Sequence, residues 1–198
     1  MSELFSIQLQ NRQQQGRDGV WLDLPTTTEQ VQAALRQIGI SSDNPQGLFI
    51  SGYFAEEEKR FAIPYNMVLA SNVDELNFLA SRLETLSTGE RAELNAALQA
   101  PQSELFSIGR ITDFPENVDY YVHLPDVHGP AQLGDYYLNR SGMVDMPEEW
   151  KGGIDTAQFG RYVAQQEQGA FTQYGYLVKS GDEWQKVHEG QPVPEEYR

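Results

Sequence analysis

Metal binding is the first chemistry that residue types and spacing could support in this chain. His123, Asp126 and His128 follow one another closely enough to ligate one ion. Proline and glycine residues at positions 125, 129 and 130 interrupt any helix or strand that would carry these three residues. The two imidazoles therefore need not lie on the same face of one element. No further ligand is evident, and we therefore expect a pair of loop histidines with no bound metal and no other cofactor.

Carboxylate catalysis is the second chemistry to weigh. Glu148, Glu149 and Asp155 could in principle supply the paired carboxylates of a glycoside hydrolase. Adjacent side chains usually diverge in direction, which makes this pairing weak. No serine lies in a nucleophile-elbow pattern, the histidines lack a convincing partner, and no glycine-rich phosphate loop is present. We therefore expect no catalytic residues and no enzymatic activity; a hydrolase with an acidic cleft remains an alternative.

The charge balance is strongly acidic. The 198 residues include 29 acids and 14 bases, which gives a net charge of −15. Residues 1–70 contribute −3 and residues 71–198 contribute −12, so the acidity is concentrated in the later part of the chain. Such a charge is repelled by a phosphate backbone, and direct binding to nucleic acid is disfavoured.

The acids of the later part are spread along the chain. An enzyme should gather its carboxylates around one pocket, whereas an interaction surface should display them in a band. Between residues 113 and 155 an acid recurs every few positions, and this pattern favours the band. The residues expected in it are Asp113, Glu116, Asp119, Asp126, Asp135, Asp145, Glu148, Glu149 and Asp155.

The expected cellular compartment follows from three features that the sequence lacks. There is no cysteine, so disulfides and thiolate metal sites are excluded. The first residues lack the basic and apolar regions of a secretory signal, and no apolar segment is long enough to span a bilayer. A cytoplasmic protein without a membrane partner is the simplest expectation.

Periodicity predicts an α+β fold in three consecutive modules. Alternating residues predict strands at 4–10, 19–24 and 48–53, and a helix begins at the threonines 26–28, so residues 1–70 form a small α/β module. Leucines at helical spacing predict a helical hairpin at about 72–100 within a central module, 71–110. The third module, 111–198, combines strands near 118–124 and 171–178 with short helices near 132–139 and 154–163, and its tail is expected to be loose.

Individual apolar residues of these elements are expected to be structural. Leu76, Leu79 and Leu83 form the helical stripe, and Trp21 is expected to be structural in the second strand. A repeated hexapeptide is less easily interpreted. Residues 2–7, SELFSI, recur as residues 103–108, where the preceding proline indicates that the second copy starts a short helix instead of a strand.

Five segments in order resemble the ArdA-type antirestriction proteins, and together they cover about residues 4–180. The segments are Gly19-Val20-Trp21-Leu22, Asp74-Glu75-Leu76-Asn77-Phe78-Leu79, Asp135-Tyr136-Tyr137-Leu138 with Gly142, Ile154-Asp155 with Phe159-Gly160-Arg161, and Gly169-Ala170-Phe171 with Gly175-Tyr176. No single segment is specific, but their ordered combination is fairly specific.

The resemblance implies an elongated protein that mimics B-form DNA. Surface carboxylates would stand where phosphates stand on a duplex, and the protein would occupy the DNA-binding groove of a type I restriction–modification enzyme. The resemblance also implies a homodimer joined through its C-terminal module. A generic acidic adaptor for protein–protein interaction remains the second alternative.

Overall fold

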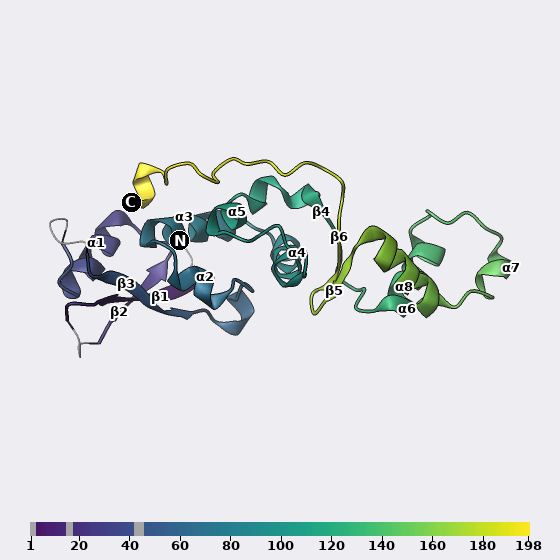
Figure 1. Cartoon of the computed structure of the whole chain (residues 1–198), viewed down its shortest axis with the longest axis horizontal. Coiled ribbons are helices and arrows are strands. Elements are labelled where there is room, and N and C mark those ends of the chain that lie inside the picture. Colours follow the sequence, from purple (N-terminus) through teal and green to yellow (C-terminus); the bar gives the residue numbers. More distant parts are fainter. Residues whose placement is uncertain (1–2, 15–17, 42–45) are drawn as a thin grey trace. The chain divides into compact units, whose positions relative to one another are not determined.

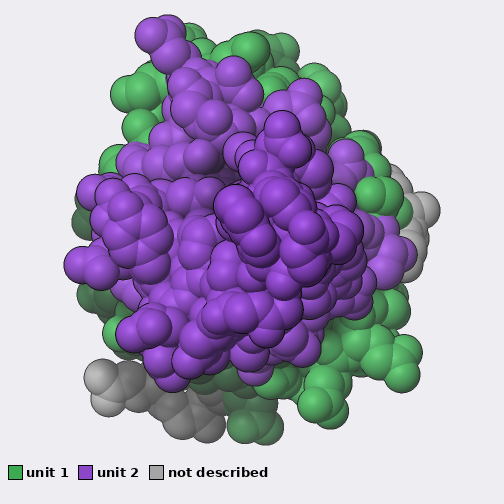
Figure 2. Space-filling model, turned by 90° about the vertical axis from the view of Figure 1, so that its right-hand side faces the viewer, with its two compact units in different colours: residues 1–87, 105–116, 185–198 green, residues 88–104, 117–184 purple. Residues whose placement is uncertain are grey.

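The computed structural model describes residues 3–14, 18–41 and 46–198, and these residues form a mixture of helices and two small antiparallel sheets (Figure 1). The α+β class predicted from the sequence is therefore confirmed. By contacts the chain divides into unit 1, residues 1–87, 105–116 and 185–198, and unit 2, residues 88–104 and 117–184 (Figure 2). The three consecutive modules and the elongated shape remain predictions.

Unit 1 is built on a three-stranded sheet of order β2-β1-β3, from β1 (Phe5–Asn11), β2 (Val20–Leu24) and β3 (Leu48–Phe54). One face of β1 presents Phe5, Ile7 and Leu9, all buried. The other face carries Trp21, whose ring lies across Gly52 but which remains 49% exposed. Trp21 was expected to be structural, and it packs on the sheet without being covered.

Helices α1 (Thr28–Gln37) and α3 (Val73–Glu84) accompany this sheet. Thr27 is the N-cap of α1, as the run of threonines predicts. Three leucines of α3, at positions 76, 79 and 83, are completely buried, which confirms the predicted stripe. Asn77 on the same helix accepts the Thr26 N–H at 2.8 Å and donates to its carbonyl at 3.0 Å, so this buried amide holds the start of α1.

Smaller elements complete unit 1. They are η1 (Glu57–Lys59), α2 (Tyr65–Leu69), α5 (Ile108–Thr112), η2 (Phe114–Glu116) and η5 (Glu195–Tyr197). The repeated hexapeptide divides as expected: Phe5-Ser6-Ile7 is strand, whereas Ser107 is the N-cap of α5. Ser2 lies outside the described residues.

Unit 2 contains the second sheet, of order β4-β6-β5, formed by β4 (Tyr121–Leu124), β5 (Ala170–Thr172) and β6 (Gly175–Lys179). Around it lie α4 (Thr88–Gln99), η3 (Val118–Tyr120), α6 (Pro130–Asp135), the π-helical turn η4 (Tyr136–Arg140), α7 (Glu148–Lys151) and α8 (Thr156–Glu167). Tyr176 of β6 and Leu133 of α6 are fully buried and form the core with Val127. None of the helices in the described ranges is long and apolar enough to cross a membrane.

Helices α6 and α8 approach each other at two glycines. A Cβ atom on Gly134 would lie 1.9 Å from the carbonyl oxygen of Thr156, and one on Gly160 would lie 1.8 Å from that of Pro130. The backbones of α6 and α8 are therefore in contact at this crossing, and only glycine leaves room for such close packing. The crossing fixes the elements that begin or end at Asp135 and Asp155.

Candidate acidic interaction surface

Seven of the nine predicted acids lie in unit 2, on or next to short elements and loops. Asp119 lies in η3, Asp126 follows β4, Asp135 ends α6, Asp145 precedes α7, Glu148 and Glu149 begin α7, and Asp155 precedes α8. All are exposed except Asp135, which is half-buried. Unit 2 carries thirteen acids and five bases in total, so its net charge is −8 over its own surface.

Two of these acids have local structural partners. Asp135 lies 3.1 Å from the Arg140 guanidinium and accepts a hydrogen bond from the Asn139 amide at 2.9 Å. Asp155 is the N-cap of α8 and accepts the Gln158 N–H at 3.0 Å. Both carboxylates are thus held in one place by their neighbours while remaining accessible to solvent.

The segment between η4 and α8 carries three strongly exposed acids. Glu148 is 83% exposed and pairs with Lys151 at 2.6 Å. Asp145 and Glu149 are exposed and form no ion pair with any described residue, and the same holds for Asp119 and Asp126. Large apolar side chains accompany these charges: Met143 is 74% exposed and Trp150 66%. A surface on which acidic and large apolar side chains are exposed together suits a contact with another macromolecule.

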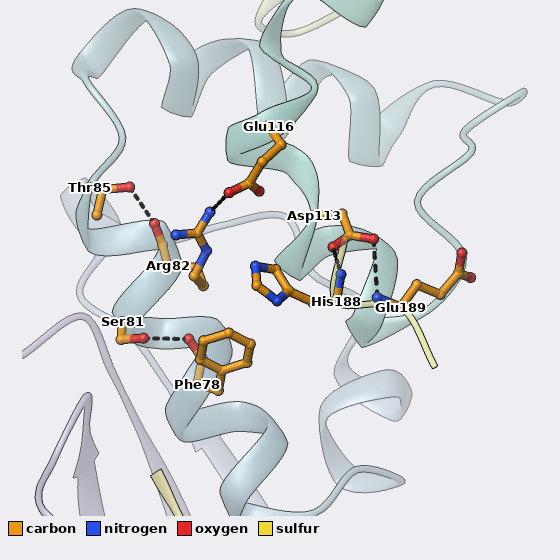
Figure 3. A network of polar contacts seen from close by, with 8 residues as sticks. All are labelled: Phe78, Ser81, Arg82, Thr85, Asp113, Glu116, His188 and Glu189. Atoms are coloured by element: carbon orange, nitrogen blue, oxygen red, sulfur yellow. Dashed lines mark hydrogen bonds and ion pairs between the residues drawn. The ribbon is translucent and has the colours of Figure 1, made fainter. Parts of the chain in front are cut away.

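The two remaining predicted acids lie in unit 1, and neither is a free surface carboxylate. Asp113 is completely buried, and its carboxylate accepts the backbone N–H groups of His188 and Glu189 (Figure 3). Glu116 is exposed but is paired with Arg82. The expectation of a displayed charge is therefore wrong for Asp113, because a segment 75 residues later covers it.

Glu93 on α4 is an acid that the sequence did not single out. Its Oε1 atom is buried and has no hydrogen-bond partner among the described residues. Burial, together with the negative charges of Glu90 and Asp119, raises the pKa of the Glu93 carboxyl to about 8. The proximity of Asp119 arises from folding, since α4 and η3 are separate in sequence, and no local pattern could have revealed it.

Glu167, at the end of α8, belongs to a cluster of hydrogen-bonded side chains inside unit 2. The Tyr137 hydroxyl donates to one of its carboxylate oxygens, and the Tyr176 hydroxyl donates to the other at 3.0 Å. Burial is the first cause that raises the pKa of both phenols, and the Glu167 charge adds to it. The group joins α8 to η4 and β6 and is best explained as structural.

The residues weighed for catalysis are not brought together. His123 Nε2 lies 2.7 Å from the Tyr174 carbonyl oxygen, and the described residues contain no group of three His, Asp or Glu side chains suited to a metal ion. Glu148 and Glu149 lie in α7, and Asp155 is already occupied as a helix cap. The cavity of about 690 Å³ in unit 1 and that of about 280 Å³ in unit 2 are lined by other residues.

Comparison with known proteins identifies one family. The family model of the antirestriction protein ArdA matches residues 15–178. The match includes all nine predicted acids, the α6–α8 crossing and both sheets apart from the first strand and the final residue of the second. Comparison with curated protein sequences gives no match.

Proposed function

The chain belongs to the ArdA antirestriction protein family, and on that premise we propose that it acts as an acidic mimic of B-form DNA. Its target is the DNA-binding groove of a type I restriction–modification enzyme. The observation that supports the proposal is the series of exposed carboxylates in unit 2, several of which form no ion pair within the ranges that the structure describes. The proposed contact residues are Asp119, Asp126, Asp135, Asp145, Glu148, Glu149 and Asp155.

Binding of this protein to the groove would have the same energetic basis as binding of DNA to it. An enzyme that binds a duplex lines its groove with Lys and Arg, which neutralise phosphates and release condensed counterions. Asp126, Asp145 and Glu149 form no ion pair with another residue in the described part of the chain, so they are available for those cations. Binding should therefore be fast, because unlike charges steer the encounter, and it should weaken as salt is added.

The alternatives are less well supported. A hydrolase needs carboxylates around one cavity, but Glu148, Glu149 and Asp155 lie apart from the cavities described above. An adaptor of unspecified partner would not account for the antirestriction family. A homodimer through residues 111–198 belongs to the same proposal and is tested by the mass of the protein in solution.

Competition with DNA is the decisive experiment. A type I restriction–modification enzyme is mixed with labelled cognate duplex, and the protein is titrated at low and at high salt. The test variant combines Asp145→Asn, Glu148→Gln and Glu149→Gln. Exposed charges contribute about 0.2–1 kcal/mol each, so three together should weaken binding about threefold to a hundredfold. The slope of log affinity against log salt should fall by up to about 3.

The chain offers a closely matched control, Glu56→Gln with Glu57→Gln and Glu58→Gln. Both triplets consist of exposed acids at a short helix, and in both one Glu pairs with a Lys three residues later, Glu56 with Lys59 as Glu148 with Lys151. Both variants change the net charge equally. Equal losses would show a general charge effect and reject the proposed contact set, and failure of the wild-type protein to displace duplex at low salt would reject mimicry.

A further inference from the structure

The segment of residues 185–198, here called the strap, follows the residues matched by the family and packs on α3 and α5 of unit 1. It is anchored first by its backbone. The Asp113 Oδ1 atom accepts the His188 N–H at 2.6 Å, and Oδ2 accepts the Glu189 N–H at 3.2 Å (Figure 3). The captured amides begin a turn, because the His188 carbonyl accepts the Gln191 N–H at 2.9 Å. The carboxylate therefore holds the backbone of the strap where it turns and is indifferent to its side chains.

Side chains of the strap add a second set of contacts. The Arg110 Nε atom lies 3.4 Å from a Glu189 carboxylate oxygen. Gly109 brings the backbone of α5 close, since a Cβ atom there would lie 3.3 Å from the Glu189 Cα. An acidic residue at position 189 is thus matched by a cation and by a glycine that permits close approach.

An aromatic clamp forms the third set of contacts. The ring of Phe78, on α3, packs edge-to-face against His188 with centroids 5.0 Å apart. The same ring contacts Tyr197 at 5.1 Å, so Phe78 holds the strap near both of its ends. Between these anchors the strap does not fill the space beneath it. A cavity of about 410 Å³ is lined by Phe78, Ile108 and strap residues 190–193.

The strap contacts α3 and α5 at discrete points, with unfilled space between them. A peptide bound to a receptor makes contacts of this kind. We propose that α3 and α5 form a peptide-binding groove, and that residues 185–198 are its built-in ligand. The ligand class is an acidic peptide that turns at two free consecutive amides and has an aromatic residue about nine positions later. The strap occupies the groove as a separable segment, so it should bind equally when it is not covalently attached.

Cutting the chain tests this proposal on the complete protein. A protease site is placed at residues 180–183, before Trp184, and the protein is cleaved after folding and passed over a sizing column at micromolar concentration. The strap peptide should co-elute with the rest of the chain. In the Asp113→Asn background it should be released, and in the Asp145→Asn background, which removes an exposed carboxylate in unit 2, it should stay bound. Release from the wild-type background would overturn the proposal.

Rebinding of synthetic peptides avoids any question of misfolded variants. Fluorescently labelled peptide 185–198 is exchanged into the cleaved protein, and unlabelled variants of the peptide compete with it. Replacing His188 by proline removes one captured N–H, and Tyr197→Ala removes one side of the clamp. Each should weaken binding at least about tenfold, while Val187→Ala, which alters a 42% exposed side chain, should change it less than about twofold. Equal affinity for all four peptides would show non-specific adhesion and reject the groove.

Discussion

At the scale of single residues, environment decides what each carboxylate does. Asp113 and Asp145 have the same side chain, yet one is an internal acceptor for backbone amides and the other lies free in solvent. Glu93 is a third case, because its charge is disfavoured by burial and by two acidic neighbours. The number of acids therefore overstates the charge that is available to a partner.

Glu93 makes stability depend on pH in a defined direction. Its pKa is about 8 in the folded protein, above the ordinary value of 4.5 for this carboxyl, so the folded state binds a proton that the unfolded state releases. This contribution is fully present below about pH 4.5 and is lost as the pH rises to about 8. Glu93→Gln should remove it, and thermal unfolding should then be shifted upward at pH 8.5 relative to wild type.

The control for this prediction is Glu149→Gln, an exposed residue whose replacement should leave the pH dependence unchanged. If wild type and Glu93→Gln lost stability in parallel between pH 5 and pH 8.5, the carboxyl would be ionised throughout and the assigned environment would be incorrect. Unfolding should be followed by circular dichroism in both cases, at a fixed salt concentration.

At the scale of elements, the α6–α8 crossing is the feature on which unit 2 depends. Gly160→Ala would place a methyl group against the Pro130 carbonyl, and backbone cannot yield as a side chain does. Overpacking of this kind costs about 1–3 kcal/mol or more. Thermal unfolding should show that loss for Gly160→Ala, whereas Gly152→Ala, which has open space around it, should be nearly neutral.

The leucine stripe of α3 is the corresponding feature of unit 1. Leu79 is fully buried, and truncation to alanine should cost about 2–5 kcal/mol by denaturant unfolding. Replacement by methionine, which conserves volume, should cost less than about 1.5 kcal/mol and serves as the control. A Leu79→Ala protein with unchanged stability would contradict the core assignment.

Elements with strong local signals were predictable from the sequence, and long-range arrangements were not. The stripe of α3 and the threonine cap of α1 follow from spacing and side-chain chemistry alone. The looseness expected of the tail stays a prediction, but the contacts of Phe78 and Asp113 with His188 could not be foreseen, because they join residues far apart in the sequence. The predicted acids of unit 2 are exposed apart from Asp135, since they lie in short polar segments, whereas the burial of Asp113 depends on residues far along the chain.

At the scale of the whole molecule, the distribution of charge separates mimicry from catalysis. Both units are acidic, with net charges of −7 for unit 1 and −8 for unit 2. A surface that substitutes for a phosphate backbone spreads its binding free energy over many weak contacts. A catalytic centre instead fails when one residue is lost.

Single substitutions should therefore be nearly silent. Asp145→Asn alone should weaken competition with duplex by about 0.2–1 kcal/mol, less than about sixfold, with a proportionate fall in salt dependence. Adding the neutralisations of Glu148 and Glu149 should deepen the loss progressively. A complete loss of inhibition from Asp145→Asn, with folding intact by circular dichroism, would point to a single essential group and away from a distributed surface.

The strap also has a consequence for the order in which the protein is made. In the nascent chain, residues 185–198 are synthesised after the whole of unit 2, although they complete unit 1. Asp113 is therefore without these two donors until residues 75 and 76 positions later have been translated, and its neighbourhood cannot take its final form in that interval. Unit 1 is begun first and finished last, and until Glu189 has been made its groove is open to any segment that reaches it.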